Sequence, residues 1–231
     1  STTRIAAFPL GTTGFTAYNE AAMGYGSSDD GGWTQALSTP FTYFGVSYNT
    51  LKVATNGYVF FASTTYGGND LNGSADAHFV VGSPRIAGLG TDLNPGLAGT
   101  VEYQRITTTG QERHVFFYRA VRVISNTQTV SFQIEIFDDG RIRITHIGSA
   151  PYNPSIVGLS SGVAATMPSS PFDTASSPRP FFPSDLSLYG DGTIANQAPA
   201  FASLPLTIGT SGQAHSYAVV ATDPNNDTLT L

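Results

Sequence analysis

The stretch VSFQIEIFDDGRIRITHI, residues 130–147, decides the fold. In its first half apolar and polar residues alternate, and the side chains of a β-strand point alternately to its two faces. The alternation returns after the acidic turn Asp138-Asp139-Gly140, where glycine tolerates the positive φ that such turns require. We therefore predict a hairpin of half-buried strands with these apolar residues in the core: Phe132, Ile134, Ile142 and Ile144.

Further strand patterns lie on both sides of this hairpin. Leu51 and Val53 lead through Thr55-Asn56-Gly57 to the apolar run 58–61, and Asn-Gly between apolar runs is a strong hairpin signal. Residues 113–124 are rich in β-branched and aromatic side chains on both faces, which is typical of a central strand. The remaining predicted strands are 41–48, 86–89, 101–107 and 156–160.

Helical patterns are nearly absent. The chain has 25 glycines and 14 prolines, which leave few stretches long enough for an ordinary helix. The best helical candidate, Ala17–Met23, covers about two turns. Many short strands with regular turns indicate a sandwich or a barrel. We expect an all-β fold, an antiparallel β-sandwich of the jelly-roll-like kind.

The pattern changes near residue 195. Asp191-Gly192 ends the first unit, and Asn196-Gln197-Ala198-Pro199 is typical of a linker. The residues that follow are too few for an independent sandwich domain, which needs roughly 100. We predict one domain at 1–195 and an incomplete second β domain at 196–231, and we expect the sequence to be a piece of a longer protein.

The composition favours an exported protein. Only 11% of the residues are charged and the net charge is −6. Nucleic acids and anionic membranes bind basic surfaces, so we expect neither as a partner. Cysteine is absent, which excludes thiol catalysis and favours a bacterial secreted or cell-surface protein. No apolar run approaches the roughly 18 residues of a membrane span, and we expect no membrane insertion.

Three motifs follow one another along the chain: FTYFGVSY at 41–48, VATNGYVFF at 53–61 and the run from Ile86 to TDLNP at 91–95. They resemble those of the nidogen-like (NIDO-type) β-sandwich modules. Segments 113–124, 130–147 and 156–159 fit the last strands of such modules, so the resemblance covers roughly residues 25 to 165. It implies adhesion, matrix contact or modular spacing, and it implies no catalytic residues.

The tail is similar to the opening of cadherin-like or immunoglobulin-like bacterial repeats, in the linker 196–199 and in DPNNDTL at 223–229. Asp223, Asn225 and Asp227 place oxygen-bearing side chains at alternate positions. Such a turn can converge on Ca²⁺, which takes six to eight oxygen ligands. The EF-hand pattern is not met, and a polar turn with Asx hydrogen bonds is the alternative.

A second candidate cation site lies in the TDLNP motif. Asp92 and Asn94 could present oxygens to a cation, or they could form an Asx turn before Pro95.

A candidate ligand site consists of aromatic residues beside polar ones. Trp33 and Tyr25 lie in one Gly-rich segment, and Tyr66, Asn69 and Asp70 lie in another. Aromatic rings can stack on a sugar face while polar groups take its hydroxyls. The same rings could instead cover the core of the sandwich.

Catalytic motifs are missing. The four glutamates form no recognisable acid pair, the four histidines show no zinc spacing, and there is no nucleophile elbow or phosphate-binding loop. We predict a non-catalytic binding or adhesion module of a large secreted bacterial surface protein. Its partners would be an extracellular protein or glycan and neighbouring domains of the same chain. A carbohydrate-binding module attached to a secreted enzyme and a structural spacer are the alternatives.

Overall fold

The computed structural model describes residues 13–61, 83–125, 127–147 and 155–162, together with the short strands 173–175, 186–189, 200–201 and 221–222. The chain divides into two compact units, Ser1–Thr193 and Ile194–Leu231. In the second unit, β15 (Ala200–Phe201) pairs with β16 (Ala221–Thr222) in antiparallel fashion.

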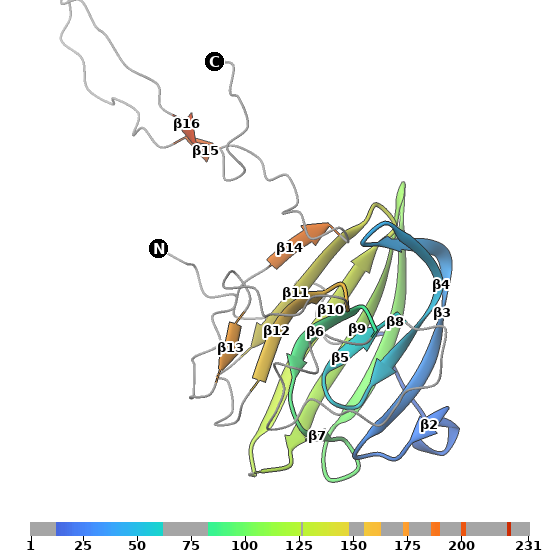
Figure 1. The fold of residues 1–231 in the computed structure, drawn as a ribbon, viewed down its shortest axis with the longest axis vertical. Coiled ribbons are helices and arrows are strands. Elements are labelled where there is room, and N and C mark those ends of the chain that lie inside the picture. The colour runs from blue at the N-terminus through green and yellow to red at the C-terminus, as the bar shows by residue number, and fades with distance from the viewer. Residues whose placement is uncertain are drawn as a thin grey trace, which may run out of the picture. The chain divides into compact units, whose positions relative to one another are not determined.

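Two antiparallel sheets build the first unit (Figure 1). Sheet A has the strand order β1-β8-β9-β10-β11-β14, and β7 also pairs with β9. Its strands are β1 (Thr16–Ala17), β7 (Leu93–Asn94), β8 (Thr100–Thr108), β9 (Gln111–Val123), β10 (Thr129–Phe137), β11 (Arg141–Ile147) and β14 (Leu186–Tyr189).

Sheet B has the order β13-β12-β6-β5-β4-β3-β2. Its strands are β2 (Tyr25–Gly26), β3 (Gly31–Tyr43), β4 (Val46–Ala54), β5 (Tyr58–Phe60), β6 (Arg85–Gly90), β12 (Ser155–Ser160) and β13 (Asp173–Ala175). The predicted all-β sandwich is confirmed. The expected near-absence of helix is also confirmed: the best helical candidate, Ala17–Met23, holds the end of β1 and a short 3-10 helix, η1 (Glu20–Ala22), capped by Asn19.

The predicted hairpin at 130–147 is confirmed as β10 and β11. Ile134 lies opposite Ile144, and Ile136 lies opposite Ile142, and the four residues predicted for the core are buried. The expectation of a half-buried strand is wrong for β10, because Glu135 on its other face is also buried. Arg143 from β11 and Arg113 from β9 form ion pairs with this carboxylate, and a buried charge needs such partners.

The segment 41–48, predicted as one strand, is instead the end of β3 and the start of β4, joined by a turn. β3 ends at Tyr43 and β4 begins at Val46. Phe44 and Gly45 between them both have positive φ, 46° and 77°, the backbone of a two-residue type I′ turn. The Asn56-Gly57 turn between β4 and β5 is confirmed, and the predicted central strand 113–124 is β9, which pairs with β8 and β10.

The core lies between the two sheets. Gly88 on β6 permits a close approach of the two sheets, since a Cβ at this position would lie 2.7 Å from the side chains of Ile134 and Phe132 on β10. Burial of an Ile or Phe side chain contributes roughly 1.5–3 kcal/mol to the free energy of unfolding. The largest fully buried side chains of the core are mostly aromatic: Tyr43, Tyr118, Phe61, Phe116, Phe132, Leu51, Ile86 and Leu89.

Candidate functional site

The predicted aromatic site at Trp33 belongs to the core. Trp33 lies in strand β3 rather than in a Gly-rich loop, and it is only 4% exposed. Its ring stacks on Tyr18 with centroids 5.0 Å apart, and its Nε1 donates to the carbonyl oxygen of Asn19. The indole therefore has no free face for a sugar.

The other members of that predicted site are placed in different ways. Tyr25 belongs to strand β2. Its backbone pairs with Gly32 of β3, the residue before Trp33. Tyr66, Asn69 and Asp70 lie outside the described residues. Ligand binding by these three side chains stays a prediction.

Three separate segments meet in a hydrogen-bonded corner formed by Asp29, Asp30, Asn56 and Asn94. The Asn56 side chain donates from Nδ2 to Asp30 over 2.8 Å and accepts at Oδ1 from the backbone N–H of Leu93 over 2.8 Å. Asn94 donates from Nδ2 to the carboxylate of Asp29 over 3.1 Å. The corner thus joins the turn before β3, the β4–β5 turn and the short strand β7.

The electrostatics of this corner match a joint between segments better than a metal site. Burial and the neighbouring Asp30 raise the pKa of Asp29, and the hydrogen bond from Asn94 works against that rise. A cation needs oxygen ligands, yet both asparagines turn their nitrogens toward the carboxylates. Asp92 is half-buried, and its carbonyl oxygen accepts from the N–H of Ile124.

Cation binding by Asp92 and Asn94 stays a prediction. The part of the chain that the structure describes contains no group of three or more His, Asp or Glu side chains that could hold a metal ion. Asp223, Asn225 and Asp227 lie outside the described residues. Calcium binding by the tail stays a prediction.

Five polar residues form a cluster that sequence reasoning missed: Ser38, Tyr103, Arg105, Glu112 and His114. The regular pairing of β3 with β4 is interrupted between Ala36 and Phe41. Ser38 lies in this interrupted stretch, beside β9. The Ser38 hydroxyl donates to Glu112, and its Oγ lies 3.3 Å from Nε2 of His114. Nδ1 of His114 lies 2.6 Å from the Tyr103 hydroxyl, and Arg105 forms an ion pair with Glu112.

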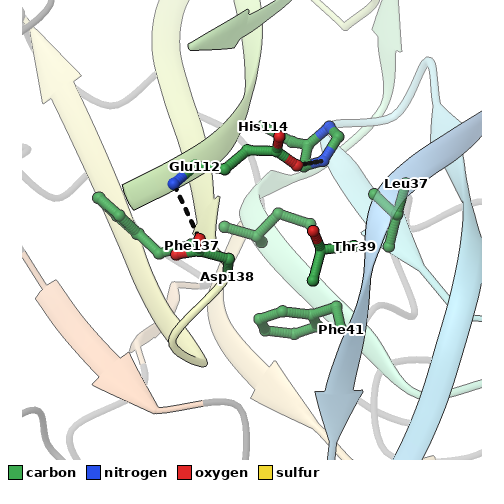
Figure 2. A pocket seen from close by; sticks show the side chains of 8 residues that line it. Leu37, Thr39, Phe41, Glu112, His114, Phe137 and Asp138 are labelled. Atoms are coloured by element: carbon green, nitrogen blue, oxygen red, sulfur yellow. Dashed lines mark hydrogen bonds and ion pairs between the residues drawn. The ribbon is translucent and has the colours of Figure 1, made fainter. Parts of the chain in front are cut away.

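The cluster borders a small cavity between β3 and the adjoining ends of β9 and β10 (Figure 2). Leu37, Phe41 and Ile136 are among its apolar walls, and Glu112 and His114 face it from β9. The cavity has room for about one water molecule. It is too small to hold a sugar ring or a peptide side chain.

Hydrogen bonding fixes the proton of His114. Burial raises the pKa of Tyr103 to about 12, so the phenol keeps its proton. Because Ser38 gives its one proton to Glu112, Nε2 of His114 meets Ser38 as a donor, and Nδ1 then accepts from the phenol. Burial also lowers the pKa of His114, so the ring is neutral with its proton on Nε2, which points toward Ser38 and Glu112. In this tautomer His114 cannot accept a proton from Ser38, and Glu112, which accepts the Ser38 hydrogen bond, is already paired with Arg105.

One feature of the sequence indicates part of this cluster. Glu112 and His114 alternate with the same parity as Phe116 and Tyr118, so the period-2 pattern places them on the core face of β9. Ser38 could not be assigned in this way, since it lies 74 and 76 positions from its two partners.

A comparison with family models supplies the relationship. The model described as NIDO related matches residues 7–181. The chain belongs to the NIDO-related family. Neither the curated proteins nor the solved structures gave a match. Within the described ranges, the NIDO-related module has no helix of the length and apolarity needed to cross a membrane.

The motifs of the NIDO-related module have structural roles. Asn56, from VATNGYVFF, and Asn94, from TDLNP, both donate to carboxylates of the corner. The family match is typical of an extracellular, non-catalytic kind of domain. It ends at residue 181, so the cadherin-like or immunoglobulin-like character of the tail stays a prediction.

Proposed function

We propose that this NIDO-related chain is a non-catalytic binding module that takes part in adhesion, as one part of a large secreted bacterial surface protein. The family match supports an extracellular module, and the observation that carries the non-catalytic part of the proposal is the closed network around His114. Among the described residues, Ser38 and His114 are the pair whose contact most resembles a nucleophile with its base. In the tautomer that satisfies Tyr103, Ser38 and Glu112 together, the His114 nitrogen beside Ser38 already carries a proton and cannot accept another.

The surrounding charges support the same conclusion. Arg105 holds Glu112 in an ion pair, and this contact and the Ser38 hydroxyl lower the pKa of the Glu112 carboxyl. An ionised carboxylate cannot act as a general acid, and one already bound by Arg105 and Ser38 is a poor general base. The cluster therefore links β3 to β8 and β9. We assign the binding function to the surface of the module.

Adhesion is tested with the full 231-residue chain coupled to beads. We expect retention under flow on a surface coated with an extracellular protein or a polysaccharide, and none on an albumin-coated control. Failure on every coated surface would instead favour the spacer hypothesis.

Catalysis is tested in parallel with panels of ester, peptide and glycoside substrates. We expect no turnover by the natural sequence. Turnover that disappears in Ser38→Ala or His114→Gln would overturn the non-catalytic assignment.

A carbohydrate-binding module attached to a secreted enzyme is the second candidate. One observation favours it: the sequence from residue 31 to residue 51, which contains the β3–β4 hairpin turn, has no charged residue. An uncharged surface with hydroxyl and amide side chains suits neutral ligands better than ionic ones.

A further inference from the structure

The turn between β3 and β4 carries backbone strain at an aromatic residue. Phe44 has a φ of 46°, a left-handed conformation that Gly, Asn and Asp adopt readily and that bulky residues rarely do. A two-residue turn of this type normally has Asn or Asp at this place, followed by Gly. Here Gly45 follows, but the first position holds a phenylalanine. Such strain, kept at one position, is typical of functional sites.

The strained ring is also presented to solvent. Phe44 is 37% exposed and Val46 is 52% exposed, and with Leu97 they are the large exposed apolar side chains of the described residues. Phe44 packs edge-on against Tyr43 with ring centroids 4.8 Å apart. Tyr43 is fully buried, and its hydroxyl donates to the carbonyl oxygen of Arg85 over 2.8 Å. The exposed ring of Phe44 therefore packs against Tyr43, whose own position is fixed by burial and by this hydrogen bond.

The surroundings of the ring are polar but uncharged. Thr42 and Ser47 are exposed and lie opposite each other in the β3–β4 pairing. Asn49 and Thr50, further along β4, are also exposed. No Asp, Glu, Lys, Arg or His occurs between residues 31 and 51. The charged residue of the hairpin is Lys52, near the end of β4 and away from the turn. An ionic ligand would therefore find no opposite charge in residues 31–51 and would lose hydration on binding.

We propose that the tip of the β3–β4 hairpin binds a neutral glycan. The apolar C–H face of a sugar ring stacks on Phe44, and the hydroxyls of Thr42 and Ser47 exchange hydrogen bonds with the sugar hydroxyls. An aromatic ring beside a few polar groups is the usual composition of such a site. This inference rests on the proposed binding function and moves the sugar contact from Trp33, which is buried, to Phe44.

The test is a glycan array probed with the full chain in three forms: the natural sequence, Phe44→Asn and Leu97→Asn. Asparagine tolerates the left-handed conformation, so Phe44→Asn keeps or raises the melting temperature while it removes the ring. We expect binding of neutral glycans to fall at least about tenfold in Phe44→Asn. Leu97→Asn, the same exchange at another exposed apolar residue, should bind as the natural sequence does. Binding should not change between low and high salt.

Three results would overturn the inference. Equal glycan binding by Phe44→Asn and the natural sequence places the sugar site elsewhere. A blank array for the natural sequence removes the glycan assignment, while retention of beads on a protein-coated surface leaves the adhesion proposal standing. A blank array together with bead retention that Phe44→Asn abolishes assigns the tip to a protein partner instead.

Discussion

The imidazole of His146, on β11, donates a hydrogen bond to the carbonyl oxygen of Gly88, on β6 of the opposite sheet, with 2.5 Å between Nε2 and the oxygen. The side chain is buried, and desolvation lowers the pKa of His146 to about 4. The ring is therefore neutral at neutral pH. This bond is a polar contact between the two sheets in a largely apolar core.

The first prediction is that the protein loses stability as the pH falls from about 6.5 to about 4. In this window the unfolded chain binds a proton at His146 that the folded chain does not bind, because the folded pKa is lowered from 6.5 to about 4. Stability is then highest above the unfolded pKa and falls with pH by roughly 3 kcal/mol from this group. Urea unfolding at a series of pH values measures the effect.

His146→Gln provides the control for this prediction, since glutamine can still donate to Gly88 but does not titrate. Its stability should depend less on pH than that of the natural sequence. His114→Gln removes the other histidine with a lowered pKa and separates its smaller share. A pH dependence unchanged in both variants would assign acid sensitivity to other groups.

A second prediction compares two glycines with nearly the same backbone. Gly57 and Gly110 have φ values of 86° and 78°. A Cβ on Gly57 would lie 1.9 Å from the carbonyl oxygen of Leu89, whereas a Cβ on Gly110 meets nothing within 4 Å. Gly110→Ala should cost about 1–2 kcal/mol of conformational strain, and Gly57→Ala a further roughly 1–3 kcal/mol for the clash. Similar losses in the two variants would contradict the close approach of the β4–β5 turn to β6.

A third prediction concerns the packing between the sheets. Ile134 is fully buried and faces Gly88, so Ile134→Ala should lower the free energy of unfolding by about 2–5 kcal/mol. Thr129→Ala, at an exposed position of the same strand, should change it by no more than about 0.5 kcal/mol. Chemical unfolding of both variants decides the matter, and equal stabilities would place the wrong face of β10 in the core.

A fourth prediction concerns calcium in the tail. If Asp223, Asn225 and Asp227 converge on one cation, a calcium titration followed by NMR should move the amide signals of these residues. The dissociation constant should be in the millimolar range, as in weak extracellular sites. Asp227→Ala should abolish the change, and Asp139→Ala, in an acidic turn of the first unit, should not. Identical spectra with calcium and with chelator would leave the segment an ordinary polar turn.

Most strands could be predicted from the sequence, because alternation and turn residues are local signals. The failures follow from partners that are distant in the chain. Glu135 looks like a solvent-facing residue in its own strand, and its burial depends on Arg113 and Arg143 on the two neighbouring strands. Phe44 is not a turn former, so the run 41–48 resembled one strand instead of two.

The candidate site was less accessible to sequence reasoning. Trp33 was identified as a notable residue, but its burial depends on the stacking of Tyr18 from another segment. Asn56 was assigned to its turn, while its role in the corner requires Asp30 and the N–H of Leu93. A turn motif reports the local backbone; it does not report which distant groups its side chains will bind.

The hydrogen-bonded corner has a consequence for how the chain folds. Its bonds join residues that are 26, 37 and 65 positions apart in the sequence, so each requires the closure of a long loop. Contacts of this range slow folding, and they form late, once the strands that carry them have assembled. During synthesis the corner cannot form before Asn94 has left the ribosome. It can nevertheless form before β12 pairs with β6, because Ser155–Ser160 leave the ribosome after Asn94.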